Sequence, residues 1–168
     1  MIVLSPVAER LSKLLKKYGS SFVTGSGVSD RIINSSLEKL QDAKQKGAGF
    51  LIGGPEKASH SALKPTIITR VTKDMQLSDE EAFGPSFSLY VVNTDQEAID
   101  LANETRYGLN AAVHSTSMDH ALSVAREIDT AQVHVNSMTA HDERRLTSTC
   151  QVLPVDANQS QLLYRLEV

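Results

Sequence analysis

The 168-residue sequence predicts an α/β fold, with a largely parallel open sheet flanked by helices. Two observations support this prediction. Short runs rich in β-branched and aromatic residues, which are typical of strands, alternate with amphipathic segments of about 12 residues, which are typical of helices. The content of 40% hydrophobic and 22% charged residues is that of a globular domain. Strands that alternate with helices are usually joined by crossover connections, and therefore pair in parallel.

The first predicted helix runs from Ser5 to Gly19. Ser5 is a favourable N-cap, Pro6 suits the first helical position, and Gly19 is a natural stop. A second helix is expected from about Ser35, where Glu38 would complete a capping box, to Gly47. One face of the first helix would carry its apolar side chains, Val7, Leu11, Leu14, Leu15 and Tyr18.

The middle of the chain predicts three strands and an exposed loop. Residues 50–52 are apolar, residues 66–69 form a β-branched run, and residues 87–92 are rich in aromatic and branched side chains. Residues 53–65 contain Pro, Lys, Ser, His and Ala, which is typical of an exposed loop.

Two further helices are predicted after residue 92. Thr94 caps the first, with Glu97 completing a capping box and Gly108 ending it. Ser117 opens the second, which we expect to reach about Asp129. Residues 109–114 and 133–136 are the accompanying strands.

Composition and charge exclude several classes of protein. The net charge is -3, and basic residues cluster only at Lys16-Lys17 and Arg144-Arg145, so we expect no nucleic-acid partner. No apolar run approaches the roughly 18 residues of a membrane span, so we expect no membrane partner. A single cysteine forms no internal disulfide, and no spacing indicates a metal site. These features predict a cytoplasmic protein.

The motif Glu-Glu-x-Phe-Gly-Pro at residues 80–85, leading into an apolar strand, resembles the signature of aldehyde dehydrogenases. The resemblance runs from about Ile2 to Glu143. The segment ending at Glu143, with Val135-Asn136 and Thr139, most resembles the branch that acts on salicylaldehyde, benzaldehyde or vanillin. Other landmarks of the family follow in order at residues 46–48, 53–54, 64–68, 71–75, 97–99, 101–103 and 107–109.

The resemblance implies a partial catalytic domain at residues 1–143, without the nucleotide-binding domain of the family. Residues 144–168 lack the family pattern, and their Ser, Thr, Gln and Asn content predicts a divergent, irregular tail. In the family, the glycine-rich cofactor turn, the oxyanion-stabilising Asn, the general-base Glu and the nucleophilic Cys precede the segment that Ile2-Val3-Leu4 resembles. We therefore expect a truncated pseudoenzyme with no catalytic residues and no redox activity of its own.

The only thiol, Cys150, lies outside the resemblance, so it is not the family nucleophile. A Cys150–His141 pair could in principle form an activated thiolate. We expect an inert thiol instead, because neighbours in sequence are not necessarily neighbours in space.

Glu81 and Phe83 are the candidate cofactor residues by resemblance. Glu81 matches the carboxylate that accepts hydrogen bonds from the nicotinamide ribose, and Phe83 matches the aromatic residue near the nicotinamide ring. Alternatively, Gly84-Pro85 fixes the turn while Glu81 is solvated and Phe83 fills the edge of the core. The family uses NAD or NADP, but we expect these contacts to be vestigial and no cofactor to be bound here, because two contacts do not supply the affinity of a whole site.

Three functions are therefore compatible with the sequence. The chain is either an inactive relative of enzymes that oxidise aromatic aldehydes to acids, a non-redox enzyme or accessory protein of a specialised (secondary) metabolic pathway, or an interaction module. The last would bind a protein partner, or form a homo-oligomer, through the former domain interface. An exposed apolar patch would favour the interaction module. A closed pocket with shifted pKa values would favour the non-redox enzyme.

Overall fold

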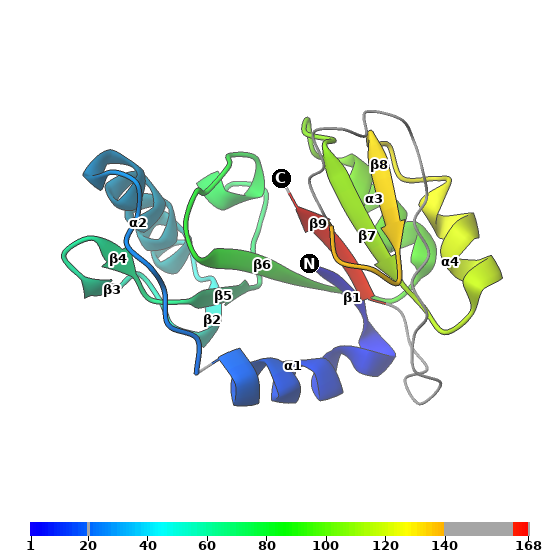
Figure 1. Ribbon diagram of the computed structural model, residues 1–168, viewed down its shortest axis with the longest axis horizontal. Helices are drawn as coiled ribbons and strands as arrows, with labels where there is room; N and C mark the ends of the chain where they lie inside the picture. Colours follow the sequence, from blue (N-terminus) through cyan, green and yellow to red (C-terminus); the bar gives the residue numbers. More distant parts are fainter. Residues whose placement is uncertain (20, 140–162, 168) are drawn as a thin grey trace. The chain divides into compact units, whose positions relative to one another are not determined.

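The computed structural model describes residues 1–19, 21–139 and 163–167, and strands and helices alternate from residue 86 to residue 135 (Figure 1). The chain divides into two units. The first unit comprises Met1–Ala8 and Val91–Val168, and the second comprises Glu9–Tyr90. The predicted α/β class is confirmed. None of the helices in the described ranges is both long enough and apolar enough to cross a membrane.

The strands of the second unit lie in the order β2-β5-β6. They comprise Gly49–Ile52, Thr66–Thr69 and Ser86–Val92, of which the last continues into the first unit. β5 and β6 pair in parallel, whereas β2 adds to β5 in the antiparallel direction. Ile68 on β5 is fully buried, as expected for the central strand.

Two helices precede these strands. Helix α1 spans Ser5–Gly19, which are the predicted bounds. Helix α2 spans Asp30–Gln45, so its predicted start at Ser35 is wrong. Its N-cap is Ser29, whose hydroxyl accepts a hydrogen bond from the backbone N–H of Ile32. The Ser29 cap and Asp30 in the first turn both favour the earlier start.

The predicted exposed loop at residues 53–65 is also corrected. Its chain forms an antiparallel hairpin of β3 (Lys57–Ser59) and β4 (Ala62–Leu63). Leu63 is buried, and its carbonyl accepts a hydrogen bond from the Thr24 hydroxyl. The two strands of the hairpin are neighbours in the sequence, but the Thr24 contact comes from a distant residue, so local composition did not indicate it.

The strands of the first unit lie in the order β1-β9-β7-β8. β1 is Ile2–Leu4, β7 is Asn110–His114 and β8 is Gln132–Val135. β7 and β8 are parallel, with helix α4 (Met118–Ala125) connecting them in sequence. The alternation of strand, helix and parallel strand is the one that the sequence predicts.

The C-terminal strand β9, Leu163–Glu167, pairs antiparallel with both β1 and β7. This strand corrects part of the predicted irregular tail. Most of residues 144–168 lie outside the described chain. Pairing with two strands of the first unit supplies the backbone hydrogen bonds that this short segment cannot make alone.

The two predicted caps of the first unit are confirmed. Thr94 accepts from the backbone N–H of Glu97 at the start of α3 (Asp95–Asn103), and Ser117 accepts from that of His120 at the start of α4. The Glu97 carboxylate accepts from the backbone N–H of Asn93 at 2.7 Å, so it contacts the residue before the cap and not Thr94, the partner that the predicted capping box requires. Both helices end earlier than Gly108 and Asp129, the predicted ends.

Candidate functional site

The candidate cofactor residues lie in the segment between the 3-10 helix η1 (Gln76–Ser78) and strand β6. Glu81 is half-buried, whereas Phe83 is 70% exposed. The exposed ring of Phe83 rules out the alternative in which it fills the edge of the core. The segment thus presents an aromatic surface two residues after a carboxylate.

The Gly84-Pro85 turn fixes the end of this segment. The backbone N–H of Gly84 donates to the carbonyl of Ala82 at 2.8 Å, and the carbonyl of Pro85 accepts from the backbone N–H of Thr66 at 2.9 Å. A Cβ atom at Gly84 would lie 3.1 Å from both Cβ and Oγ of Ser36. The glycine therefore permits a close approach between the turn and helix α2.

Lys39 on helix α2 contacts the acidic pair at the centre of the segment. Its Nζ donates to the backbone carbonyl of Glu81 at 2.5 Å and lies 3.3 Å from a carboxylate oxygen of Glu80. The Lys39 side chain is only 12% exposed. Glu81 is thus held through its backbone, and the ion pair uses the neighbouring carboxylate.

A second group of polar contacts holds the chain just before this segment. The Asp42 carboxylate accepts from the backbone N–H of Gln76 at 2.9 Å and lies 2.7 Å from Nζ of Lys46. Lys46 also donates to the backbone carbonyl of Asp74. The hydrogen bond from Lys46, followed by that from Gln76, lowers the pKa of Asp42.

Two other carboxyl groups have lowered pKa values for similar reasons. The hydrogen bond from Lys64 lowers the pKa of Glu56, and the hydrogen bond from Thr72 lowers that of Asp74. A lowered pKa makes a carboxylate a weaker base. These hydrogen bonds therefore favour the charged forms of the three carboxyl groups.

Sequence reasoning missed the residues of α2 that hold the segment. Ser36, Lys39 and Asp42 recur at intervals of three, so on a helix they lie on neighbouring turns of one face. That spacing was a usable signal, since the predicted second helix already contained all three. The spacing did not show which distant segment would pack against this face of the helix.

The remaining predictions about chemistry concern thiols and metals. Cys150 and His141 lie outside the described residues. Within residues 1–19, 21–139 and 163–167, no group of three or more His, Cys, Asp or Glu side chains is placed to hold a metal ion.

Comparison with known proteins identifies the family. The profile described as the aldehyde dehydrogenase family matches residues 3–148. Vanillin dehydrogenase from Corynebacterium glutamicum is 35% identical over 121 residues, which cover 72% of this chain and 25% of that enzyme. Succinate-semialdehyde dehydrogenase [NADP(+)] from Deinococcus radiodurans is 42% identical over 103 residues, which cover 61% of this chain and 22% of the enzyme.

Solved structures agree with these sequence relatives. Succinic semialdehyde dehydrogenase from Streptococcus pyogenes, solved in complex with NADP+, has a TM-score of 0.77 at 30% identity, over 83% of this chain and 33% of that one. An NAD-dependent benzaldehyde dehydrogenase from Corynebacterium glutamicum has a TM-score of 0.75 at 29% identity, over 82% and 31%. The chain thus spans about a quarter of these curated relatives and a third of these solved chains. It belongs to the aldehyde dehydrogenase family.

Proposed function

We propose that Glu81 and Phe83 form the part of an aldehyde dehydrogenase catalytic domain that contacts the nicotinamide–ribose end of NAD or NADP. One observation carries this proposal: a half-buried carboxylate and a 70% exposed aromatic ring lie two residues apart on a segment held by α2 and β5. Solved relatives named as NAD-dependent or bound to NADP+ support the choice of ligand.

The chemistry of both side chains suits this role. An ionised carboxylate only accepts hydrogen bonds, so Glu81 can bind the two hydroxyls of a ribose. The exposed face of Phe83 offers apolar surface to a nicotinamide ring. The likeness to vanillin and benzaldehyde dehydrogenases supports an aromatic aldehyde as the substrate class of the whole domain.

The 168-residue chain by itself is proposed to be redox inactive. Aldehyde oxidation in this family depends on a thiolate nucleophile, and the only cysteine, Cys150, lies outside residues 3–148, which match the family. Two contacts also supply a small part of the affinity of a dinucleotide site. We expect a dissociation constant on the order of millimolar or weaker for the chain alone.

Titration of the full chain with nicotinamide mononucleotide, followed by NMR chemical shifts, tests the contact. The Phe83 ring and the Glu81 amide should shift together, and Glu81→Gln should weaken the response. Glu38→Gln, on the exposed face of α2, is the matched control and should leave the titration unchanged. Shifts confined to other residues would overturn the assigned site.

An absorbance assay with NAD or NADP and benzaldehyde tests the proposed inactivity. We expect no reduced cofactor from the folded 168-residue chain. Sustained turnover that survives Cys150→Ser would show that a residue other than the thiol supplies the chemistry, and turnover that disappears in this variant would assign the nucleophile to Cys150. Either result would contradict the proposal.

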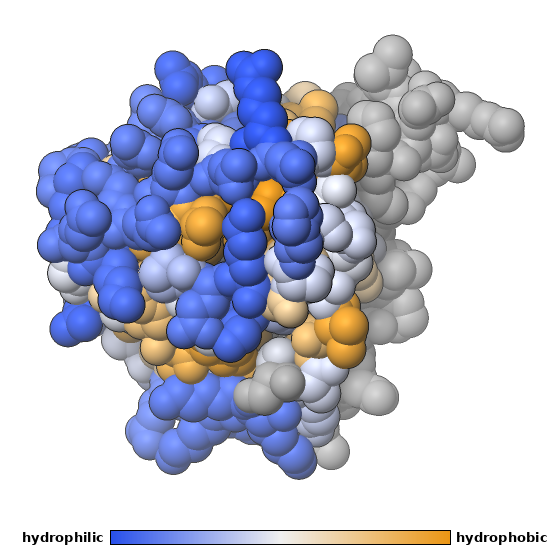
Figure 2. All heavy atoms as spheres, turned by 90° about the vertical axis from the view of Figure 1, so that its left-hand side faces the viewer, coloured by the Kyte–Doolittle hydropathy of each residue, from blue (hydrophilic) through white to orange (hydrophobic). Residues whose placement is uncertain are grey.

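An interaction module is the second candidate, because the second unit exposes large apolar side chains. Figure 2 shows apolar side chains at the surface among hydrophilic ones, on the side that carries α2 and the β3–β4 hairpin. Such surface favours a protein partner or a second copy of the chain. The exposed residues of this unit include Tyr18 (57%), Phe22 (68%), Val23 (94%) and Val28 (93%).

Sedimentation velocity across a range of protein concentrations tests this second candidate. Self-association that Phe22→Ser and Val23→Ser abolish would support it, and a monomer at all concentrations would remove the homo-oligomer.

A further inference from the structure

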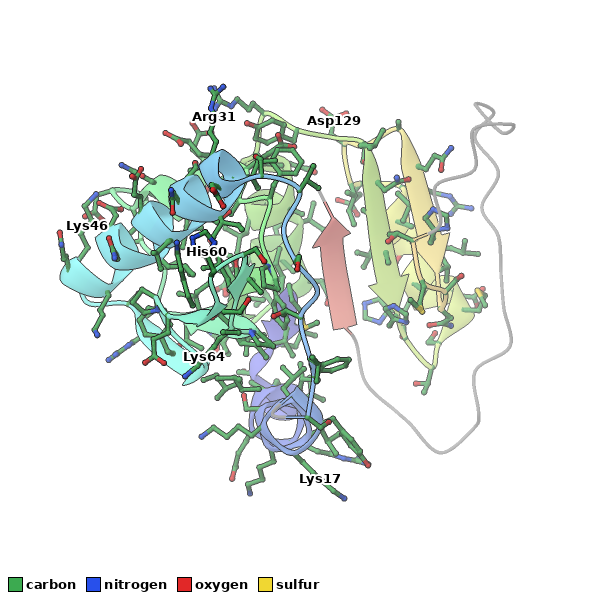
Figure 3. The ribbon with its side chains drawn as sticks, turned by 60° about the vertical axis from the view of Figure 1, so that its left-hand side comes forward. Lys17, Arg31, Lys46, His60, Lys64 and Asp129 are labelled. Carbon is green, nitrogen blue, oxygen red and sulfur yellow. The ribbon has the colours of Figure 1, made fainter. Side chains whose placement is uncertain are left out.

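One face of helix α2 contacts residues 74–84, the stretch that carries Glu81, and the order of the contacts along the helix is the reverse of the order along this stretch. In Figure 3, Arg31 and Lys46 mark the two ends of this helix. Each contact further along the helix meets an earlier residue of this stretch. The contacting pairs are Ser36 with Gly84, Lys39 with Glu80 and Glu81, Asp42 with Gln76, and Lys46 with Asp74.

We propose that Lys39 is a positioning residue, which fixes the Glu80–Glu81 backbone on helix α2 and so determines where the Glu81 carboxylate is presented. The inference rests on the proposed function only for the identity of the ligand. Lys39 lies on the side of the segment that faces the helix, and the proposal gives it no contact with the cofactor.

The division of contacts around Lys39 supports this role. Its hydrogen bond uses the carbonyl of Glu81, and its ion pair uses the carboxylate of Glu80. Neither contact occupies the Glu81 carboxylate, which is the group proposed to accept the ribose hydroxyls. Lys39 can therefore restrain the residue without blocking its function.

Because the Lys39 side chain is largely buried, its ammonium group needs oxygen partners from the protein. The Lys39 side chain as a whole is 12% exposed, and the ammonium group of a side chain buried to this extent is stable only when oxygen atoms replace the water that it loses. The Glu81 carbonyl and the Glu80 carboxylate provide those oxygens. A fixed carbonyl also restricts the peptide plane that follows Glu81, because the peptide bond is planar.

Hydrogen exchange of the full chain, measured by mass spectrometry without any ligand, tests the restraint. In Lys39→Met, amides of residues 79–84 should exchange at least about ten-fold faster, since a loss of about 1.4 kcal/mol of local stability has that effect. Lys39→Arg keeps the charge and the donors, and should restore much of the protection. Lys44→Met, at an exposed position of the same helix, is the control and should leave the segment unchanged.

Two exchange results would overturn the proposal. Unchanged protection of residues 79–84 in Lys39→Met would show that the contact does not hold the segment. Faster exchange of equal size throughout residues 9–90 would show that Lys39 only supports the stability of the whole unit. Thermal melting by circular dichroism separates a locally loosened variant from an unfolded one.

Titration with nicotinamide mononucleotide then tests whether the position of the Glu81 carboxylate affects ligand binding. Lys39→Met should raise the apparent dissociation constant about ten-fold, and Lys39→Arg should bring it back toward that of the wild type. If the wild-type chain does not bind the nucleotide, the proposed function is contradicted. The hydrogen-exchange result would still show whether Lys39 restrains the segment. Unchanged affinity in a Lys39→Met chain with a loosened segment would overturn the positioning role.

Discussion

The side chain of Asn136 forms two hydrogen bonds with the backbone of Ser115. Its Oδ1 accepts from the Ser115 N–H at 2.8 Å, and its Nδ2 donates to the Ser115 carbonyl at 2.8 Å. Asn136 adopts a left-handed conformation with φ of 54°, and its own N–H donates to the carbonyl of Val113 at 2.8 Å. One residue therefore joins the ends of the parallel strands β7 and β8.

Asn136→Ala should destabilise the protein by about 3–4 kcal/mol. The loss combines two hydrogen bonds at about 1 kcal/mol each with the left-handed backbone, which costs alanine about 1–2 kcal/mol. Asn136→Gly removes the same amide but tolerates the backbone, so it should be less damaging. Urea unfolding measures both variants, and equal losses would show that the backbone conformation contributes nothing.

Gly53 and Gly47 allow a matched comparison of two glycine-to-alanine substitutions. Both have positive φ, 64° and 91°, but a Cβ at Gly53 would lie 2.2 Å from the backbone carbonyl oxygen of Pro65, whereas Gly47 faces open space. Gly47→Ala should cost about 1–2 kcal/mol for the left-handed backbone alone. Gly53→Ala should cost clearly more, because the β2–β5 connection must move. Chemical denaturation of both variants decides this, and similar costs would contradict the prediction.

Stability at low pH should depend on Asp42. Its pKa is lowered in the folded protein by the hydrogen bonds from Lys46 and Gln76. The contribution is therefore present above the unfolded pKa of about 4, and is lost as the pH falls through the lower folded value. Wild type and Asp42→Asn should differ in melting temperature at neutral pH and converge in acid.

Glu38→Gln is the control for this titration, since Glu38 lies on the exposed face of the same helix. It should follow the wild type at every pH. A difference between wild type and Asp42→Asn that persists unchanged below pH 3 would show that ionisation of Asp42 is not its source.

His134 should be replaceable by an apolar residue of similar shape. The side chain is 7% exposed, and its Nε2 atom has no hydrogen-bond partner among the residues that the structure describes. A buried polar atom without a partner costs about 1–3 kcal/mol. We expect His134→Phe to raise the free energy of unfolding by about 1 kcal/mol, whereas a marked loss would indicate that the ring nitrogen is satisfied.

Local signals correctly predicted the elements that depend on local chemistry. Ser5, Pro6 and Gly19 define α1, and the hydroxyls of Thr94 and Ser117 cap α3 and α4 as expected. A cap acts within three residues of the chain, and β-branched runs such as residues 66–69 favour strands wherever they lie. Such features are readable from the sequence because the interacting groups are neighbours in it.

The motif around Glu81 and Phe83 could also be recognised, but not its surroundings. Resemblance to the family located both residues, and the structure then showed which of them is half-buried and which is exposed. The start of α2 was placed too late because two serines, Ser29 and Ser35, each provide a plausible cap. Only the folded chain shows that Ser29 is the one used.

The sequence by itself determined the family, the alternation of helices and strands, and the candidate cofactor motif. The tertiary structure alone decided that residues 57–63 form a hairpin, that Leu163–Glu167 pair with β1 and β7, and that Lys39 holds the Glu80–Glu81 segment. The last two depend on partners that are far away in the sequence. The strands of the hairpin are neighbours in the sequence, but the hairpin buries Leu63 and accepts a hydrogen bond from the distant Thr24. The sequence shows that residue 39 is a lysine and therefore carries a charge. Only the fold determines which oxygen atoms replace the water around its ammonium group.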